Sequence, residues 1–284
     1  MDIENRIDKI LEVYAVARVV VQQFGHTVKF AKHAVALAIK QIKHLTDEEL
    51  AKFVGTNKIG KMIGYTNIPD PSIFSKFRER ADPKILEFTA NVVIQLKYKD
   101  TPLKLFSQDS TSVDAFSRED KDADWGVRTI PKKRQTDKDK KVESFYGYKL
   151  HAAVDALTDN PVAFFIRQGN EHDKKLFGTV LDFLKKNFVI GHGAKYLADS
   201  AFDSSDVREE LRYNDIVPVI ATNGRGHRPS EIPKDSDYGR RWSVERFFSR
   251  LKEMFGLAKN RFIGMRKVMI HIYSCIIAHL IYFS

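Results

Sequence analysis

Apolar residues recur at helical spacing in the first part of the chain, over residues 7–20 and again over residues 28–45. The stretch Thr46-Asp-Glu-Glu49 has the form of a capping box that begins a further short helix. The stretch Asp70-Pro71-Ser72 can cap and begin another one. We therefore predict an all-helical domain over residues 1–100.

Beyond residue 100, short alternating runs indicate strands that are separated by helices. The first run alternates over residues 102–109 and becomes polar at Asp109. The elements expected after it are a hairpin of residues 148–157 and 162–167, a helix that ends near residue 188, a strand at 194–199, a helix at 205–212, a strand at 216–221 and a helix at 238–256. This order predicts an α/β fold class, with a mixed sheet flanked by helices, for a second domain over residues 101–284.

Two further segments complete the expected layout. Residues 118–143 hold nine basic and seven acidic residues and few apolar ones, which is typical of a charged insert loop in solvent. Residues 268–283 are mostly apolar but are interrupted by His271, Ser274 and His279, and they are fewer than the roughly 20 residues that cross a membrane. We therefore expect a helix buried against the sheet, and no membrane partner.

The helix predicted at residues 238–256 has separate polar and apolar faces. With about 100° between successive residues and Arg241 at zero, Tyr238, Glu245 and Lys252 lie at about 60°, 40° and 20°, away from an apolar stripe. One interpretation of this polar face is a ladder of ion pairs at i,i+4 spacing, which is common on soluble helices. The other is a functional site.

The charge balance favours a polyanionic partner. The chain has 47 Lys and Arg residues against 37 Asp and Glu residues, which gives a net charge of +10. Residues 240–267 contain nine basic residues and two acidic ones, so the excess gathers around the predicted polar face. Cys275 is the only cysteine, which excludes an internal disulfide and a cysteine-based metal cluster and suits a reducing cytoplasm.

The spacing Tyr238-x2-Arg241-x3-Glu245-x6-Lys252 resembles the signature of the DDE transposases of prokaryotic insertion sequences. The resemblance implies a ribonuclease-H-like fold for the predicted mixed sheet. It also implies that Glu245 is the third acid of a metal-binding Asp/Asp/Glu triad, and that Tyr238, Arg241 and Lys252 contact DNA phosphates. Such a triad requires two aspartates earlier in the chain.

Two aspartates that follow predicted strands are similar to the first two acids of that family. Asp109 begins the stretch Asp-Ser-Thr, with Asp114 as the alternative, and Asp199 ends the strand at 194–199. Asp109 and Asp199 are 90 residues apart, and Asp199 and Glu245 are 46 apart, so only the tertiary fold can bring them together. The short second interval places the chain with the compact branch of the family. Carboxylates of this kind hold two Mg²⁺ ions, for which Mn²⁺ can substitute.

The resemblance has further implications for partners. It implies that the chain binds double-stranded DNA, namely terminal inverted repeats and target DNA, as a homodimer in a synaptic complex, and that it is nucleoid-associated in the cytoplasm. The stretch Ser72-Ile-Phe-Ser-Lys-Phe-Arg-Glu-Arg80 resembles part of the DNA-end-binding domain of such transposases. A helical packing domain with a basic surface is the alternative for residues 1–100.

The expected function is Mg-dependent cleavage of DNA at insertion-sequence ends, followed by strand transfer through in-line transesterification. Two alternatives are a ribonuclease-H-like nuclease that only hydrolyses DNA and a DNA-binding relic that has lost catalysis.

Trp242 also has two interpretations. It lies at about 100° on the helical wheel, off the apolar stripe, where it can stack on an unpaired DNA base or pack against the N-terminal helices.

Overall fold

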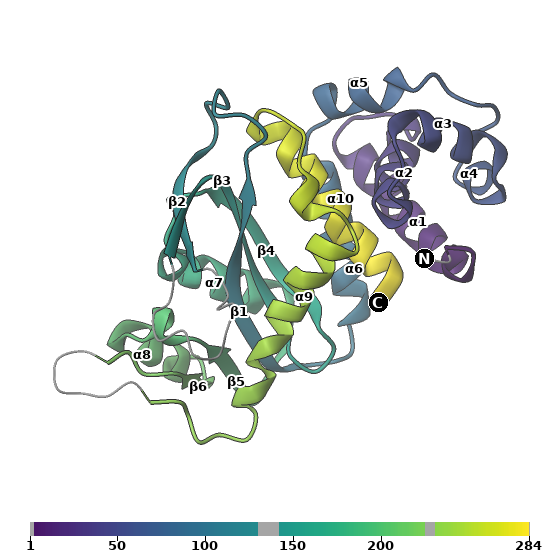
Figure 1. Ribbon diagram of the computed structural model, residues 1–284. Helices are drawn as coiled ribbons and strands as arrows, with labels where there is room; N and C mark the ends of the chain where they lie inside the picture. The colour runs from purple at the N-terminus through teal and green to yellow at the C-terminus, as the bar shows by residue number, and fades with distance from the viewer. Residues whose placement is uncertain (1–2, 130–141, 225–230, 284) are drawn as a thin grey trace. The chain divides into compact units, whose positions relative to one another are not determined.

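The computed structural model describes residues 3–129, 142–224 and 231–283. The chain forms two compact units (Figure 1). One unit combines Met1–Lys99 with Ser249–Ser284, and the other is Asp100–Phe248. The sequence analysis had assigned residues 249–284 to the sheet domain, whereas their contacts group them with the N-terminal helices.

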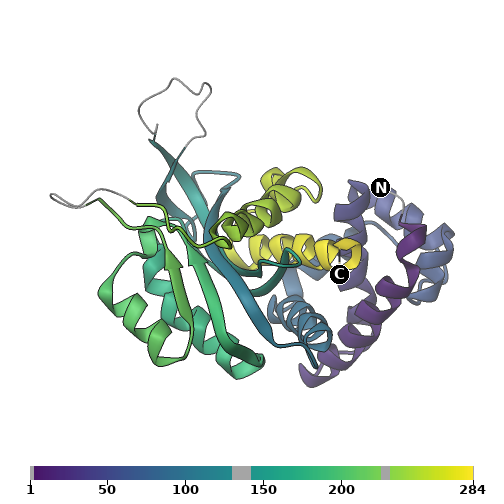
Figure 2. The same ribbon diagram turned by 90° about the horizontal axis from the view of Figure 1, so that it is seen from below.

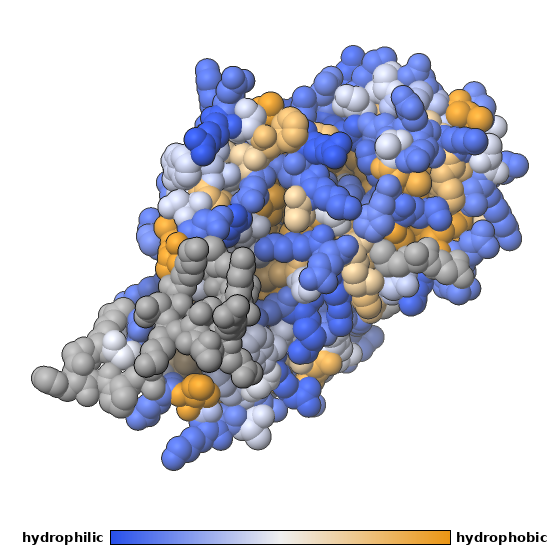
Figure 3. All heavy atoms as spheres, viewed as in Figure 1, coloured by the Kyte–Doolittle hydropathy of each residue, from blue (hydrophilic) through white to orange (hydrophobic). Residues whose placement is uncertain are grey.

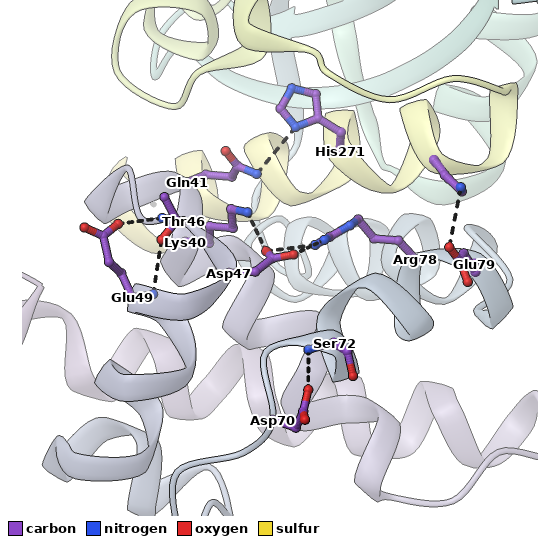
Figure 4. A network of polar contacts seen from close by, with 11 residues as sticks. Lys40, Gln41, Thr46, Asp47, Glu49, Asp70, Ser72, Arg78, Glu79 and His271 are labelled. Carbon is purple, nitrogen blue, oxygen red and sulfur yellow. Dashed lines mark hydrogen bonds and ion pairs between the residues drawn. The ribbon is translucent and has the colours of Figure 1, made fainter.

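The first unit, which we call the helical unit, is built from amphipathic helices. Its α-helices are α1 (Ile7–Gln23), α2 (Lys29–Lys43), α3 (Asp47–Thr56), α4 (Lys58–Met62), α5 (Ser72–Arg80), α6 (Lys84–Lys97) and α10 (Met265–Phe283). The predicted capping box at the start of α3 is confirmed. The backbone N–H of Glu49 donates to Thr46 Oγ1 (3.2 Å), and the backbone N–H of Thr46 donates to Glu49 Oε2 (2.7 Å) (Figure 4).

The last helix, α10, is buried along most of its length and packs against α2 and α6 of the helical unit. The sequence analysis predicted burial for this segment but expected the sheet to cover it. The thiol of Cys275 donates to the backbone carbonyl of Phe255 (3.2 Å), and the hydroxyl of Ser274 donates to that of Ile270 (2.7 Å), so both polar groups are satisfied inside the unit. No helix in the described part of the chain is long and apolar enough to cross a membrane.

A buried ion-pair network joins three helices of this unit (Figure 4). Arg78 of α5 is 6% exposed and pairs through both terminal nitrogens with the carboxylate of Asp47, at the start of α3. Lys40 of α2 donates to the same carboxylate (2.5 Å). Burial works to raise the pKa of Asp47, but the hydrogen bonds from Arg78 and Lys40 outweigh it and hold that pKa below its usual value.

The second unit, which we call the sheet unit, contains six strands in the order β2-β3-β1-β5-β6, with β4 paired to β3 (Figure 1). The strands β1, β2, β3 and β4 pair in antiparallel fashion, whereas β1, β5 and β6 run parallel. The bounds are β1 (Leu103–Asp114), β2 (Asp124–Thr129), β3 (Val142–Asp155), β4 (Asn160–Gln168), β5 (Ile190–Ala198) and β6 (Val217–Ile220). This is the mixed sheet that the sequence predicted.

Helices cover both faces of the sheet, which confirms the predicted α/β class. Figure 2 shows α7 (Phe177–Asn187) and α8 (Ser205–Tyr213) on the side away from α9 (Trp242–Glu253). Phe177 of α7 packs edge-on against Tyr196 of β5 (5.6 Å between ring centroids). The exposed hydrophobic residues on the face drawn in Figure 3 lie in small groups among hydrophilic ones.

Two details of the predicted strands were wrong. The first strand does not end at Asp109 but continues to Asp114, because β3 provides antiparallel partners as far as Gly147. Part of the predicted loop at 118–143 is also strand, since β2 pairs with the first residues of β3. Residues 130–141 of that predicted loop lie outside the described residues.

The ion-pair network of the helical unit generates a stability prediction. We expect Arg78→Ala to lower the free energy of unfolding by about 2–3 kcal/mol, because the carboxylate of Asp47 then stays partly buried with Lys40 as its remaining partner. Urea denaturation of the whole chain at neutral pH measures this loss. Arg80→Ala is the matched control, since Arg80 lies on the same helix but is exposed. Equal losses in both variants would contradict the assigned role of Arg78.

Candidate active site

The pairing of β1 with β5 sets the position of the first two acids of the predicted triad. These strands are parallel, and Ser107 lies beside Leu197, an offset of 90 residues. Asp109 and Asp199 are separated by the same offset and each follows that pair by two residues. Because neighbouring strands are about 4.8 Å apart, this register brings Asp109 of β1 near Asp199, which comes directly after the end of β5.

The segment that carries Glu245 is attached to the same face. Tyr238, in the short 3₁₀ turn Tyr238–Arg241 before α9, packs against a small apolar cluster made by Leu105, Ala156, Leu197 and Val219. One turn later, the hydroxyl of Ser243 lies 2.7 Å from that of Ser107, and both side chains are fully buried. The start of α9 is therefore fixed on β1 close to Asp109.

Electrostatics link Asp109 to the other acids. The pKa of Asp109 is raised to about 7, with burial as the largest cause and the negative charges of Asp199, Asp173 and Glu245 as further ones. A hydrogen bond from the backbone N–H of Ser110 (2.7 Å) works in the opposite direction. The three acids of the predicted triad thus share one electrostatic neighbourhood, in which each negative charge opposes the ionisation of Asp109.

Glu245 itself is held by an arginine. Arg241 Nη1 lies 2.9 Å from Glu245 Oε1, one helical turn away, and the side chain of Arg241 is only 14% exposed. The i,i+4 ion pair considered in the sequence analysis is therefore present for these two residues. Lys252, the last residue of the signature, is partly exposed on the same helix.

The donor set fits a hard divalent cation by its chemistry, since all three predicted ligands are carboxylates and each is at least partly accessible. Within residues 3–129, 142–224 and 231–283, however, no three His, Cys, Asp or Glu side chains are arranged closely enough to hold a metal ion. Asp199 accepts a hydrogen bond from the backbone N–H of Ala201 (2.8 Å), and Glu245 is paired with Arg241. A metal site of the triad therefore requires the three carboxylates to lie closer together than they do in this structure.

The alternative first acid, Asp114, lies in a different environment. It follows Asp109 by five residues on β1, which corresponds to about 17 Å along an extended strand. Its carboxylate pairs with Arg128 (2.6 Å), and that guanidinium also binds Glu143 (2.6 Å). The position of Asp109, beside β5 and the start of α9, is the one that suits the predicted triad.

Trp242, the first residue of α9, is 54% exposed. The guanidinium carbon of Arg241 lies 4.9 Å from the centre of its ring, within the range of a cation–π contact. The large apolar side chains of α9, such as Phe247 and Leu251, are fully buried instead. The indole is therefore not part of the apolar stripe of α9.

The sequence analysis missed one acid of this site. Asp173 Oδ1 lies 3.1 Å from Nδ1 of the buried His151 and 3.8 Å from Lys149 Nζ. Burial works to raise the pKa of Asp173, but contacts with His151 and Ser110 hold it below its usual value. The neighbouring His172 is exposed and makes no side-chain capping bond. The sequence pattern that could have indicated this cluster is the alternation of Lys149 and His151 with apolar residues on a strand, which directs both side chains to one face.

Comparison with known proteins identifies the family of the chain. A synaptic complex of the piggyBac transposase with hairpin DNA, solved by cryo-electron microscopy, is similar with 16% sequence identity and a TM-score of 0.45. The match covers 88% of this chain and 65% of that one. No curated protein matches the sequence. Residues 101–281, well over half of the chain, match the model of the transposase DDE domain. The chain therefore belongs to the transposase DDE domain family.

Proposed function

We propose that this protein is a transposase that cuts DNA at the ends of an insertion sequence and joins those ends to target DNA. The observation that carries the proposal is the placement of the family's acids. The β1–β5 register brings Asp109 near Asp199, and the charge of Glu245 acts on Asp109. The family match over the same residues supports this assignment.

In this proposal, Asp109, Asp199 and Glu245 hold two Mg²⁺ ions, for which Mn²⁺ substitutes. When bound, a pair of such ions activates a water or a DNA 3′-hydroxyl and stabilises the leaving oxygen of an in-line displacement at phosphorus. The chain's own contribution is to position the carboxylates. Tyr238 and Ser243 fix the start of α9 on the sheet. Arg241 balances the charge of Glu245 when no cation is bound to that carboxylate.

The proposed DNA contacts surround Glu245. Tyr238, Arg241 and Lys252 bind phosphates, and the exposed indole of Trp242 stacks on an unpaired base at the DNA end. The partners are the terminal inverted repeats and the target duplex, bound by a homodimer in a synaptic complex, with the protein associated with the nucleoid. Residues 1–100 are proposed to bind the DNA end, and residues 101–284 to carry the chemistry.

Glu245→Gln tests the catalytic proposal. We expect no cleavage of a DNA duplex that carries the insertion-sequence end, whereas binding is unchanged or tighter because a negative charge near the phosphates is removed. The assay supplies Mg²⁺ and separates hydrolysed from strand-transferred products on a denaturing gel. Glu253→Gln is the matched control, since Glu253 lies on the same helix but is exposed and outside the signature.

The products of the unaltered protein also distinguish the alternative functions. Joined products support a transposase, free ends alone point to a nuclease, and binding without any cleavage points to a relic. Cleavage that survives in Glu245→Gln would remove this residue from the proposed triad.

The phosphate contacts predict a salt dependence. We expect Arg241→Ala and Lys252→Ala each to weaken DNA binding regardless of sequence and to reduce the slope of log Kd against log salt by about one unit per lost contact. Fluorescence anisotropy over a salt series measures the slope. Arg246→Ala is the control, because Arg246 on the same helix is held by the carboxylate of Asp159 (2.7 and 2.9 Å). An unchanged slope in both variants would assign Arg241 and Lys252 to a structural ladder.

Trp242→Ala separates base stacking from packing. Since the side chain is about half exposed, we expect little change in the free energy of unfolding but impaired processing of the DNA end after the first nick. Thermal denaturation and a nicked-end substrate provide the two measurements. Phe247→Ala, a fully buried change on the same helix, is the reference for a core loss of about 3–5 kcal/mol. A loss of that size for Trp242→Ala would show that the indole is a core residue.

A further inference from the structure

The helical unit contains a cavity of about 600 Å³. Its wall is formed by α2, the residues that lead into α3, Arg78 of α5, the loop at residues 256–262 and α10. The apolar part of the wall includes Leu37, Leu45, Phe262 and Ile270. A volume of roughly 300–1,000 Å³, with apolar walls and a few polar groups, is typical of sites for small ligands. None of the lining residues belongs to the sheet unit, so the cavity is distinct from the proposed active site.

Positive charge exceeds negative charge at the wall of this cavity. The charged lining residues are Lys40, Arg78, Lys259 and Arg261 against Asp47 and Glu48. Lys40 and Arg78 share the carboxylate of Asp47, so their charge is partly neutralised. Lys259 and Arg261 are exposed, and neither has a carboxylate within ion-pair distance in the part of the chain that the structure describes. Two positive charges at the cavity are therefore available to an anion.

A buried histidine of α10 adds a hydrogen-bond donor to the lining. His271 is 5% exposed, and Gln41 Nε2 lies 3.5 Å from its Nδ1 (Figure 4). Burial, the largest cause, lowers the pKa of His271 to about 4, against the opposing effect of the Leu257 and Gly256 carbonyls, so the ring is neutral at pH 7. Because the amide nitrogen of Gln41 donates to Nδ1, the single ring proton is on Nε2. This nitrogen has no hydrogen-bond partner within the described residues, and an acceptor in the cavity would supply one.

We propose that this cavity binds a small organic phosphate monoester with an aromatic or other apolar body. Lys259 and Arg261 hold the phosphate, because a dianion matches two positive charges and a guanidinium can bind two phosphate oxygens at once. The apolar body lies against Leu37, Phe262 and Ile270. The concave and partly apolar wall favours a small molecule over a DNA duplex, whose phosphates bind more polar surfaces. The inference uses residues of the helical unit alone and does not depend on the proposed action on DNA.

A series of small ligands tests the proposal on the whole chain. Isothermal titration calorimetry, without divalent metal and without DNA, compares phenyl phosphate with inorganic phosphate, benzoate and benzyl alcohol. We expect phenyl phosphate to bind at least about tenfold more tightly than each of the others, because it alone combines an apolar ring with a double negative charge. Equal affinity for phenyl phosphate and inorganic phosphate would show that the apolar wall is not used.

Variants locate the binding site. Lys259→Ala and Arg261→Ala should each weaken phenyl phosphate binding by about five- to twentyfold, and both should keep the fold because the side chains are exposed. Lys267→Ala is the matched control, since Lys267 is a cation of α10 that does not line the cavity and is paired with Glu79 (3.7 Å). Phe262→Leu should reduce the preference for phenyl phosphate over inorganic phosphate, because the aromatic part of the wall is lost. Thermal denaturation of each variant checks its folding.

Two further results would overturn the proposal. The first is an absence of phenyl phosphate binding, or equal losses for Lys259→Ala and Lys267→Ala, which would show that the cavity is not a specific site. The second is displacement of phenyl phosphate by a DNA duplex, with Arg261→Ala weakening the binding of both to the same extent. That result would assign the cavity to the DNA-binding surface. Because the small-ligand titrations contain neither DNA nor metal, a failure of the proposed cleavage chemistry does not affect them.

Discussion

The proposed site depends on the parallel register between β1 and β5, because that register brings Asp109 of β1 near Asp199, the residue that follows β5. Such an arrangement is unfavourable in isolation, since burial and the neighbouring negative charges both raise the pKa of Asp109, to about 7. The surrounding packing compensates for it. The backbone of β1 is held by β3 at Asp109 itself and by β5 as far as Ser107, which restrains a movement of the strand that would relieve the repulsion.

The helix α9 has a buried face that anchors it and a polar face that carries Glu245. Its buried face, with Phe247 and Leu251, stabilises the helix, and the hydrogen bond between Ser243 and Ser107 sets its position along β1. Its polar face supplies Glu245 and the arginine that balances it. Because the anchoring residues differ from the proposed catalytic residue, we expect substitutions of Glu245 to leave the helix in place.

Local spacing predicted most of the helices and the capping box of α3, and the order of the elements along the chain predicted the mixed sheet. The extension of β1 past Asp109 was missed because polar residues there resemble a strand end, while the residues of β3 that pair with the extension lie 33 to 41 residues later. The strand β2 was hidden by charged neighbours, although Trp125 and Val127 alternate with less exposed residues. The grouping of residues 249–284 with the N-terminal helices, and the place of Asp173, depend on contacts between distant segments. The three acids were proposed only through the family resemblance. Their separations of 90 and 46 residues along the chain do not indicate whether they lie close together in space.

The net charge of +10 overstates the positive charge that is available to DNA. Several arginines of the sheet unit are held by carboxylates, as Arg128, Arg208 and Arg246 are. To bind a phosphate they would first have to give up an existing ion pair. Arg241 differs from these, because its partner Glu245 is itself a proposed metal ligand. In the proposed function, cations held by Glu245 would compete with Arg241 for the same carboxylate, and a weakened ion pair would leave the guanidinium available to a phosphate. Charge neutralisation at the acids and recognition of the DNA backbone are then linked through a single ion pair.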